Sequence, residues 1–160
     1  MPTLRKTIVI DRGWKKIKNS FYTLNNSAVK VGYPAEETQE RNVTETTLNV
    51  GLTNTALAMF HEFGTKNLPP RPFVRLSFDN ARVKINGFIA RTYKSIIENK
   101  FSVSTGLDHL GLFGKNIIQS FFPSILPPLK PSTISKKKSS AVLIDTGQLR
   151  ASVTYVKVTK

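Results

Sequence analysis

The sequence predicts an α+β fold, in which a small antiparallel or mixed β-sheet is packed on one face by long α-helices. Three observations support this prediction: short β-prone runs lie toward both ends of the chain, long apolar patterns with helical spacing lie between them, and no internal repeat is visible. With 160 residues and 39% hydrophobic content, the chain is expected to form a single α+β domain over 1–160, with 1–27 as an N-terminal extension.

The first third of the chain predicts a helix followed by two strands. Residues 11–25 predict an amphipathic helix with Asp11 at its N-cap. Its apolar positions, three or four residues apart, are Trp14, Ile17, Phe21 and Leu24. Residues 28–33 are typical of a strand. The polar segment 35–47 is expected to be an extended loop or hairpin tip, and 47–52 a returning strand.

The middle of the chain predicts two helices joined by a stiff connector. The first helix is predicted over 54–63, with Gly64 as its stop. Its apolar surface is expected to come from Ala56, Leu57, Met59, Phe60 and Phe63. Three prolines make 68–72 an extended connector, because they fix φ and remove N–H donors. The second helix is predicted over 73–100, with Gly87 as a weak point.

The last third predicts another helix, an arm and a strand. Residues 102–106 are expected to separate the preceding helix from the next one, over 107–122. Repeated prolines then predict a proline-rich extended arm over 123–141. One helical turn is predicted at 145–150 and a final strand over 152–158. The buried side of that strand is expected to carry Val153, Tyr155 and Val158.

The chain is strongly basic, with 24 Lys and Arg against 10 Asp and Glu, a net charge of +14. Residues 81–160 hold 13 of the basic and only 3 of the acidic side chains. Such a field attracts polyanions and acidic protein surfaces alike. Lys136, Lys137 and Lys138 are candidate contacts to DNA or to an acidic partner, although a lysine run is also typical of a solvated loop.

Several classes of protein are disfavoured by what the sequence lacks. It has no apolar run of about 18 residues, which argues against a transmembrane helix and a membrane partner, and its first residues do not resemble a secretory signal. It has no cysteine, which excludes disulfides and thiolate metal sites. Zinc-finger spacing, an RNA-binding aromatic signature and a basic zipper are also absent, so base-specific recognition is not expected.

Candidate catalytic motifs are incomplete. Asp145-Thr146-Gly147 matches an aspartic-protease motif, but only 13 residues follow the glycine, too few for the rest of such a domain. In the structural interpretation, Asp145 or Thr146 caps the next helical turn. His61-Glu62 lacks the second histidine of a zinc-protease helix, because position 65 is Thr. We therefore expect no catalytic residues, no metal and no cofactor.

The order of several motifs is more informative than any one of them. A block His61-Glu62-Phe63-Gly64-Thr65 precedes Pro69-Pro70-Arg71-Pro72-Phe73-Val74-Arg75 and a long helical stretch. Leu129-Lys130-Pro131-Ser132-Thr133-Ile134 and the block from Leu143 through Asp145, Thr146, Gly147 and Leu149 to Tyr155 follow. This succession resembles the virion morphogenesis family of tailed bacteriophages, the neck or tail-completion proteins of head–tail connector type. The resemblance covers roughly 28–33 and 56–158.

The resemblance implies a non-enzymatic structural virion protein that forms a ring, typically a hexamer, between the capsid connector and the tail tube. Double-stranded DNA would pass through the lumen. The implied partners are further copies of the chain, connector or adaptor proteins on the capsid side, and the tail tube or tail terminator protein. The implied location is the virion neck, and the host cytoplasm during assembly. A basic nucleic-acid-binding module without enzymatic activity is the alternative.

The motif residues themselves are expected to have structural roles. Gly64 is expected to end a helix, and the prolines to aim Phe73 into the core. Arg71 and Arg75 lie at a helix N-terminus, where the helix dipole disfavours a cation. They are therefore predicted either to pair with Glu62 or Asp145 or to be solvated.

Overall fold

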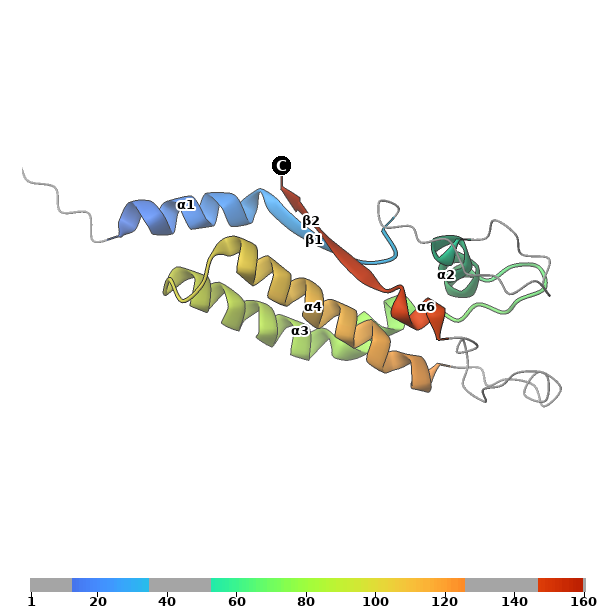
Figure 1. The fold of residues 1–160 in the computed structure, drawn as a ribbon. Helices are drawn as coiled ribbons and strands as arrows, with labels where there is room; N and C mark the ends of the chain where they lie inside the picture. Colours follow the sequence, from blue (N-terminus) through green and yellow to red (C-terminus); the bar gives the residue numbers. More distant parts are fainter. Residues whose placement is uncertain (1–12, 35–52, 126–146, 160) are drawn as a thin grey trace, which may run out of the picture.

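A computed structural model describes residues 13–34, 53–125 and 147–159 (Figure 1). In chain order its elements are α1 (Trp14–Asn25), β1 (Ser27–Gly32), α2 (Asn54–Phe63), α3 (Phe73–Ile97), α4 (Val103–Phe121), the 3-10 helix η2 (Phe122–Ser124), α6 (Gln148–Ala151) and β2 (Thr154–Thr159). Long helices with a small antiparallel sheet packed on them confirm the predicted α+β class.

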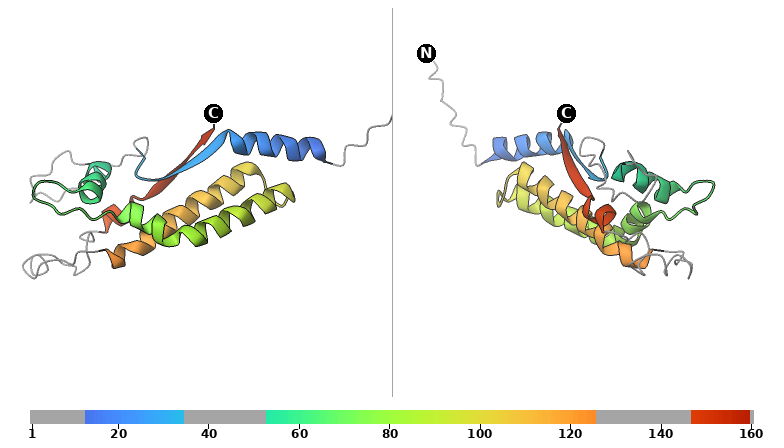
Figure 2. Two further views of the ribbon diagram at one scale, coloured as in Figure 1. Left: turned by 180° about the vertical axis from the view of Figure 1, so that it is seen from behind. Right: turned by 45° about the vertical axis from the view of Figure 1, so that its right-hand side comes forward.

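The architecture is a long helical hairpin with a two-stranded sheet laid across it. Helices α3 and α4 run antiparallel to each other, and both views of Figure 2 show the strands on the α4 side. Strands β1 and β2 are antiparallel, in a register from Ser27 opposite Thr159 to Gly32 opposite Thr154. Sequence-distant strands therefore form one sheet, and α1 continues from the end of the sheet alongside the turn of the helical hairpin, in contact with α3 and α4, with its N-terminal end projecting past them (Figure 1).

Small residues on α4 let the sheet approach closely. A Cβ atom added at Gly111 would overlap the ring of Tyr155 on β2, and one added at Gly114 would lie 3.0 Å from Val31 on β1. Between α4 and α3, the ring of Phe113 stacks on the ring of Phe88, with centroids 4.1 Å apart. Close packing of α4 on both neighbours thus fixes the layers.

The main core lies where α2 and α6 meet the start of α3 and the end of α4. Its buried members are Ala58, Phe73, Ile118, Phe122, Ile125, Leu149 and Val153. Phe73 is fully buried and packs edge-to-face on Tyr33 at 6.1 Å and on Phe122 at 5.1 Å. Burying each large apolar side chain contributes about 1.5–3 kcal/mol, so this cluster is the chief apolar contribution to stability.

The central predictions agree closely with the structure. Helix α2 has the predicted bounds, because Thr53 accepts a hydrogen bond from the Ala56 N–H at its start and Gly64 follows its end. The predicted extended connector is wrong at Pro72 (φ −73°, ψ 66°), which is the centre of an inverse γ-turn closed by the Phe73 N–H and the Arg71 carbonyl at 2.7 Å. Helix α3 runs from Phe73 to Ile97 without interruption, so the weak point predicted at Gly87 is wrong.

Several predicted boundaries are wrong for identifiable reasons. Helix α1 begins at Trp14, with Gly13 as its N-cap in a left-handed conformation (φ 94°), whereas Asp11 had been predicted as the cap. Helix α4 begins at Val103, four residues early, because Ser102 accepts a hydrogen bond from the Thr105 N–H and caps it. The break between α3 and α4 therefore covers residues 98–102, whereas 102–106 had been predicted.

The C-terminal part of the described chain shows two more differences. Pro123 lies in η2 and not in an extended arm, since proline is tolerated in the first turn of a helix. The final strand begins at Thr154, two residues later than predicted, after the helical turn of α6. Outside the described residues lie the loop 35–47, the strand 47–52, most of the arm, and Lys136, Lys137, Lys138, Asp145 and Thr146.

Candidate assembly interface

Glu62 connects α2 to the start of α3. Its carboxylate oxygens Oε2 and Oε1 accept hydrogen bonds from the backbone N–H groups of Val74 at 2.9 Å and Arg75 at 3.1 Å. These N–H groups belong to the first turn of α3, where backbone donors have no acceptor within the helix. A negative charge at this position also interacts favourably with the helix dipole. Glu62 thus binds the main chain of Arg75, whereas the two alternatives that the sequence left open were an arginine side chain paired with Glu62 or Asp145 and a solvated arginine.

The segment after Glu62 forms a tight reversal. Gly64 has φ 78°, and a Cβ there would lie 3.0 Å from the carbonyl oxygen of Leu68 and from Pro70. Thr65 exchanges backbone hydrogen bonds with Leu68 at 2.9 and 3.2 Å. The N–H of Arg71, a residue that is itself buried, donates to the His61 carbonyl. Pro72 then occupies the N-cap of α3, next to the buried Phe73.

The two motif blocks converge on the same core. Gly147, with φ 75°, is the N-cap of α6, and the predicted cap by Asp145 or Thr146 lies outside the described residues. Leu149 is buried against the cluster that contains Phe73. The Tyr33 hydroxyl donates to the Leu149 carbonyl at 2.8 Å, and burial, with a smaller effect of the Glu62 charge, raises the pKa of Tyr33.

Helix α2 exposes a group of large apolar side chains, which we call the α2 patch. It consists of Met59, Phe60 and Phe63, whose exposed fractions are 55, 42 and 76%. Although Phe63 belongs to the first motif block, it points away from the core, while its neighbour Glu62 binds α3. The apolar pattern in the sequence had suggested a buried face, so this exposure identifies a surface that the other described residues leave uncovered.

Helix α1 carries a second exposed surface, the α1 ridge. Its members are Trp14, Lys18, Phe21 and Tyr22, and the three aromatic side chains are 69, 52 and 74% exposed. Leu24 is the buried residue of the helix. In Figure 1 α1 lies at the opposite end of the molecule from α2. Trp14 and Phe21, two of the apolar positions of the predicted amphipathic helix, are therefore exposed in the structure.

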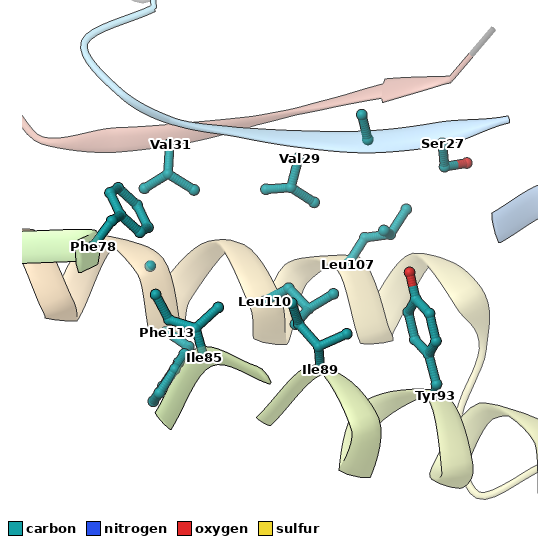
Figure 3. A pocket seen from close by; sticks show the side chains of 12 residues that line it. Ser27, Val29, Val31, Phe78, Ile85, Ile89, Tyr93, Leu107, Leu110 and Phe113 are labelled. Atoms are coloured by element: carbon teal, nitrogen blue, oxygen red, sulfur yellow. The ribbon is translucent and has the colours of Figure 1, made fainter. Parts of the chain in front are cut away.

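A third apolar surface is concave. The β1–α3–α4 groove, shown in Figure 3, has a volume of about 230 Å³. It is lined by side chains of β1, α3 and α4, among them Val29, Val31, Phe78, Ile85, Ile89 and Leu110. It is smaller than the roughly 300–1,000 Å³ typical of small-molecule sites. The groove therefore suits one or two side chains better than a metabolite.

Most of the acidic side chains that the structure describes are engaged within the chain. The described residues contain 15 Lys and Arg but only four carboxylates. Glu62 binds backbone, Glu98 pairs with Lys100 at 2.8 Å, and Asp108 accepts a hydrogen bond from Lys157 at 2.9 Å. The hydrogen bond from Lys100 lowers the pKa of Glu98, and that from Lys157 lowers the pKa of Asp108. The surface left for partners is strongly basic.

The described ranges contain no group of three or more His, Cys, Asp or Glu side chains that could hold a metal ion. Within the same ranges no helix is long and apolar enough to cross a membrane. Comparisons with known protein families, with curated proteins and with solved structures find no match for this chain.

Proposed function

We propose that this chain is a non-enzymatic structural protein of the neck of a tailed bacteriophage. It assembles as a ring, hexameric as in the family it resembles, between the capsid connector and the tail tube, with double-stranded DNA passing through the lumen. The observation that carries this proposal is the exposure of large apolar side chains on the α1 ridge and the α2 patch, at opposite ends of the molecule. A subunit with several neighbours needs such separate contact surfaces.

The roles of the motif residues support a building block. Glu62, Gly64 and Phe73 shape and anchor the junction between α2 and α3, and Leu149 packs on that junction from α6. None of these roles requires bond-making chemistry. Phe63, in the same motif block as Glu62 and Gly64, is a large apolar side chain that points outward. We assign the α2 patch to the next layer of the neck, formed by a connector or adaptor protein on one side or by a tail tube or terminator protein on the other.

The charge supports the expected partners. Because three of the four described carboxylates are engaged within the chain, the described surface carries an excess of positive charge, which suits backbone phosphate in the lumen or an acidic surface of a neighbouring layer. Lys136, Lys137 and Lys138 are included in this proposal on the basis of the sequence.

The mass and shape of the purified full-length protein test the proposal. Light scattering after size exclusion should give a multiple of the 17.9 kDa chain, and negative-stain images should show rings with a central hole. A particle that remains a single chain at every concentration, yet binds duplex DNA with an affinity that falls steeply with salt, contradicts the ring and supports the basic nucleic-acid-binding module.

A variant separates DNA binding from ring formation. Replacing Lys136, Lys137 and Lys138 together with alanine should preserve the ring and reduce the salt dependence of DNA binding, by about 0.9 in the log–log slope for each phosphate that is no longer neutralised. Lys94→Ala, on the exposed face of α3, is the control. An unchanged slope would show that the lysine run does not touch DNA.

A further inference from the structure

We propose that α1 of one copy docks in the β1–α3–α4 groove of the next copy, with Trp14 and Phe21 as its apolar anchors and Lys18 beside Asp79. This inference rests on the proposed ring and deepens it by naming the contact between neighbouring subunits. It makes the contact heterologous, so that the same pair of surfaces repeats around the ring until the ring closes.

The α1 ridge offers the area that such a contact needs. A fully buried aromatic side chain covers about 150–250 Å², so the exposed fractions of Trp14, Phe21 and Tyr22 correspond to roughly 400 Å². A standard interface buries about 800 Å² on each partner. Three side chains of one short helix thus supply roughly half of the area that one partner buries in a standard interface. Buried aromatic residues also contribute much of the binding energy of an interface.

The groove offers a matching receptor. Its lining residues are mostly aliphatic and aromatic, and its volume of about 230 Å³ accommodates one or two large side chains. In Figure 3 the side chains of Val29 and Val31 point from β1 toward those of Ile85, Ile89 and Leu110, with open space between them. An inserted indole or phenyl ring would fill this space and remove apolar surface from water on both copies.

The occupant is a second copy because α1 is poorly placed to fill its own groove. Only Asn26 separates α1 from β1, the strand that forms one wall of the groove. Trp14 lies eleven residues before Asn25, about 17 Å along the helix axis, and Figures 1 and 2 show α1 directed away from the strands. Docking within one chain would require α1 to fold back at Asn26.

Charge complementarity also favours a second copy. Among the described carboxylates, Asp79 is the one whose side chain makes no hydrogen bond or ion pair. It is exposed and directly follows Phe78, which lines the groove. Lys18 lies on α1 between the two apolar anchors, at positions 14 and 21. A lysine carried into the groove with those anchors would meet an available carboxylate at the rim.

Trp14 reports directly on this contact, because it is the single tryptophan of the chain. Its fluorescence maximum should shift to shorter wavelength as the concentration of the full-length protein rises, in parallel with the mass measured by light scattering. Phe21→Ala should raise the concentration for half-assembly at least tenfold, and Val83→Ala, at a position 86% exposed on α3, should not. Circular dichroism confirms that both variants fold.

A charge exchange tests the orientation of the contact. Lys18→Glu and Asp79→Lys should each weaken assembly by roughly fivefold, the effect of a rim ion pair, and the double variant should restore it. Rings that form in Phe21→Ala at the wild-type concentration, or without a change in Trp14 fluorescence, overturn this contact while leaving the proposed ring intact. A wild-type protein that never assembles overturns both. Failure of the double variant to recover rejects the pairing of Lys18 with Asp79.

Discussion

Replacing Glu62 with alanine removes both acceptors from the start of α3. The N–H groups of Val74 and Arg75 then lose hydrogen bonds of 2.9 and 3.1 Å. Loss of a capping side chain costs about 0.5–2 kcal/mol. Because this acceptor is charged, binds two donors and is half-buried, we expect a loss near the top of that range, about 2 kcal/mol in the free energy of unfolding.

Thermal unfolding followed by circular dichroism measures this loss. In a domain of about this size, 1 kcal/mol corresponds to roughly 2–4 °C in Tm, so Glu62→Ala should lower Tm by about 4–8 °C. Glu62→Gln keeps a neutral acceptor and should lie between wild type and alanine. Glu98→Ala is the matched control, since it removes an exposed carboxylate whose partners are surface lysines, and it should change Tm little.

The comparison between the two alanine variants shows whether the Glu62 carboxylate stabilises the start of α3. If Glu62→Ala unfolds at the same temperature as Glu98→Ala, the carboxylate does not stabilise α3 and the assigned role of the first motif block is wrong. A loss of ring mass without a loss of Tm would instead place Glu62 in a contact between subunits.

Four further outcomes are expected. Gly111→Ala should lower Tm by several degrees, because its Cβ would overlap the Tyr155 ring, an overpacking that costs about 1–3 kcal/mol. Gly87→Ala, with nothing within 4 Å, should raise the free energy of unfolding by about 0.5–1 kcal/mol in the same melts. The raised pKa of Tyr33 means that above its ordinary value of 10.0 the unfolded chain releases a proton that the folded chain keeps. Stability should therefore fall as pH rises, by up to about 1.4 kcal/mol per pH unit, and urea titrations of Tyr33→Phe should show a shallower fall. Phe63→Ser should leave Tm unchanged because the side chain is 76% exposed, but should weaken capture of the adjoining layer in a pull-down.

Much of the fold could be predicted from local patterns. The bounds of α2 followed from an apolar pattern that ends at Gly64, and the structure adds the N-cap Thr53, which had not been predicted. The start of α3 followed from prolines that can precede a helix but not continue it. The start of α4 was missed because Val103 to Gly106 have weak helix propensity, which the cap provided by Ser102 offsets.

The candidate interface could not be predicted in the same way. Amphipathic spacing shows that one face of a helix is apolar, but it does not show whether that face is covered by the same chain. Trp14 and Phe63 fit their helical patterns as well as Leu24 does, yet only Leu24 is buried. Likewise, Arg71 and Arg75 were predicted either to pair with Glu62 or Asp145 or to be solvated, whereas the proline turn brings Glu62 to backbone donors that no sequence pattern records.

The pairing of β1 with β2 has a consequence for synthesis of the protein. Ser27 pairs with Thr159, so more than a hundred further residues must be synthesised before β1 can pair with β2. Such a long-range closure slows folding and leaves a β-prone edge uncovered during translation. The α3–α4 hairpin, built from neighbours in sequence, is able to fold first and provide the platform on which the late strand closes the sheet.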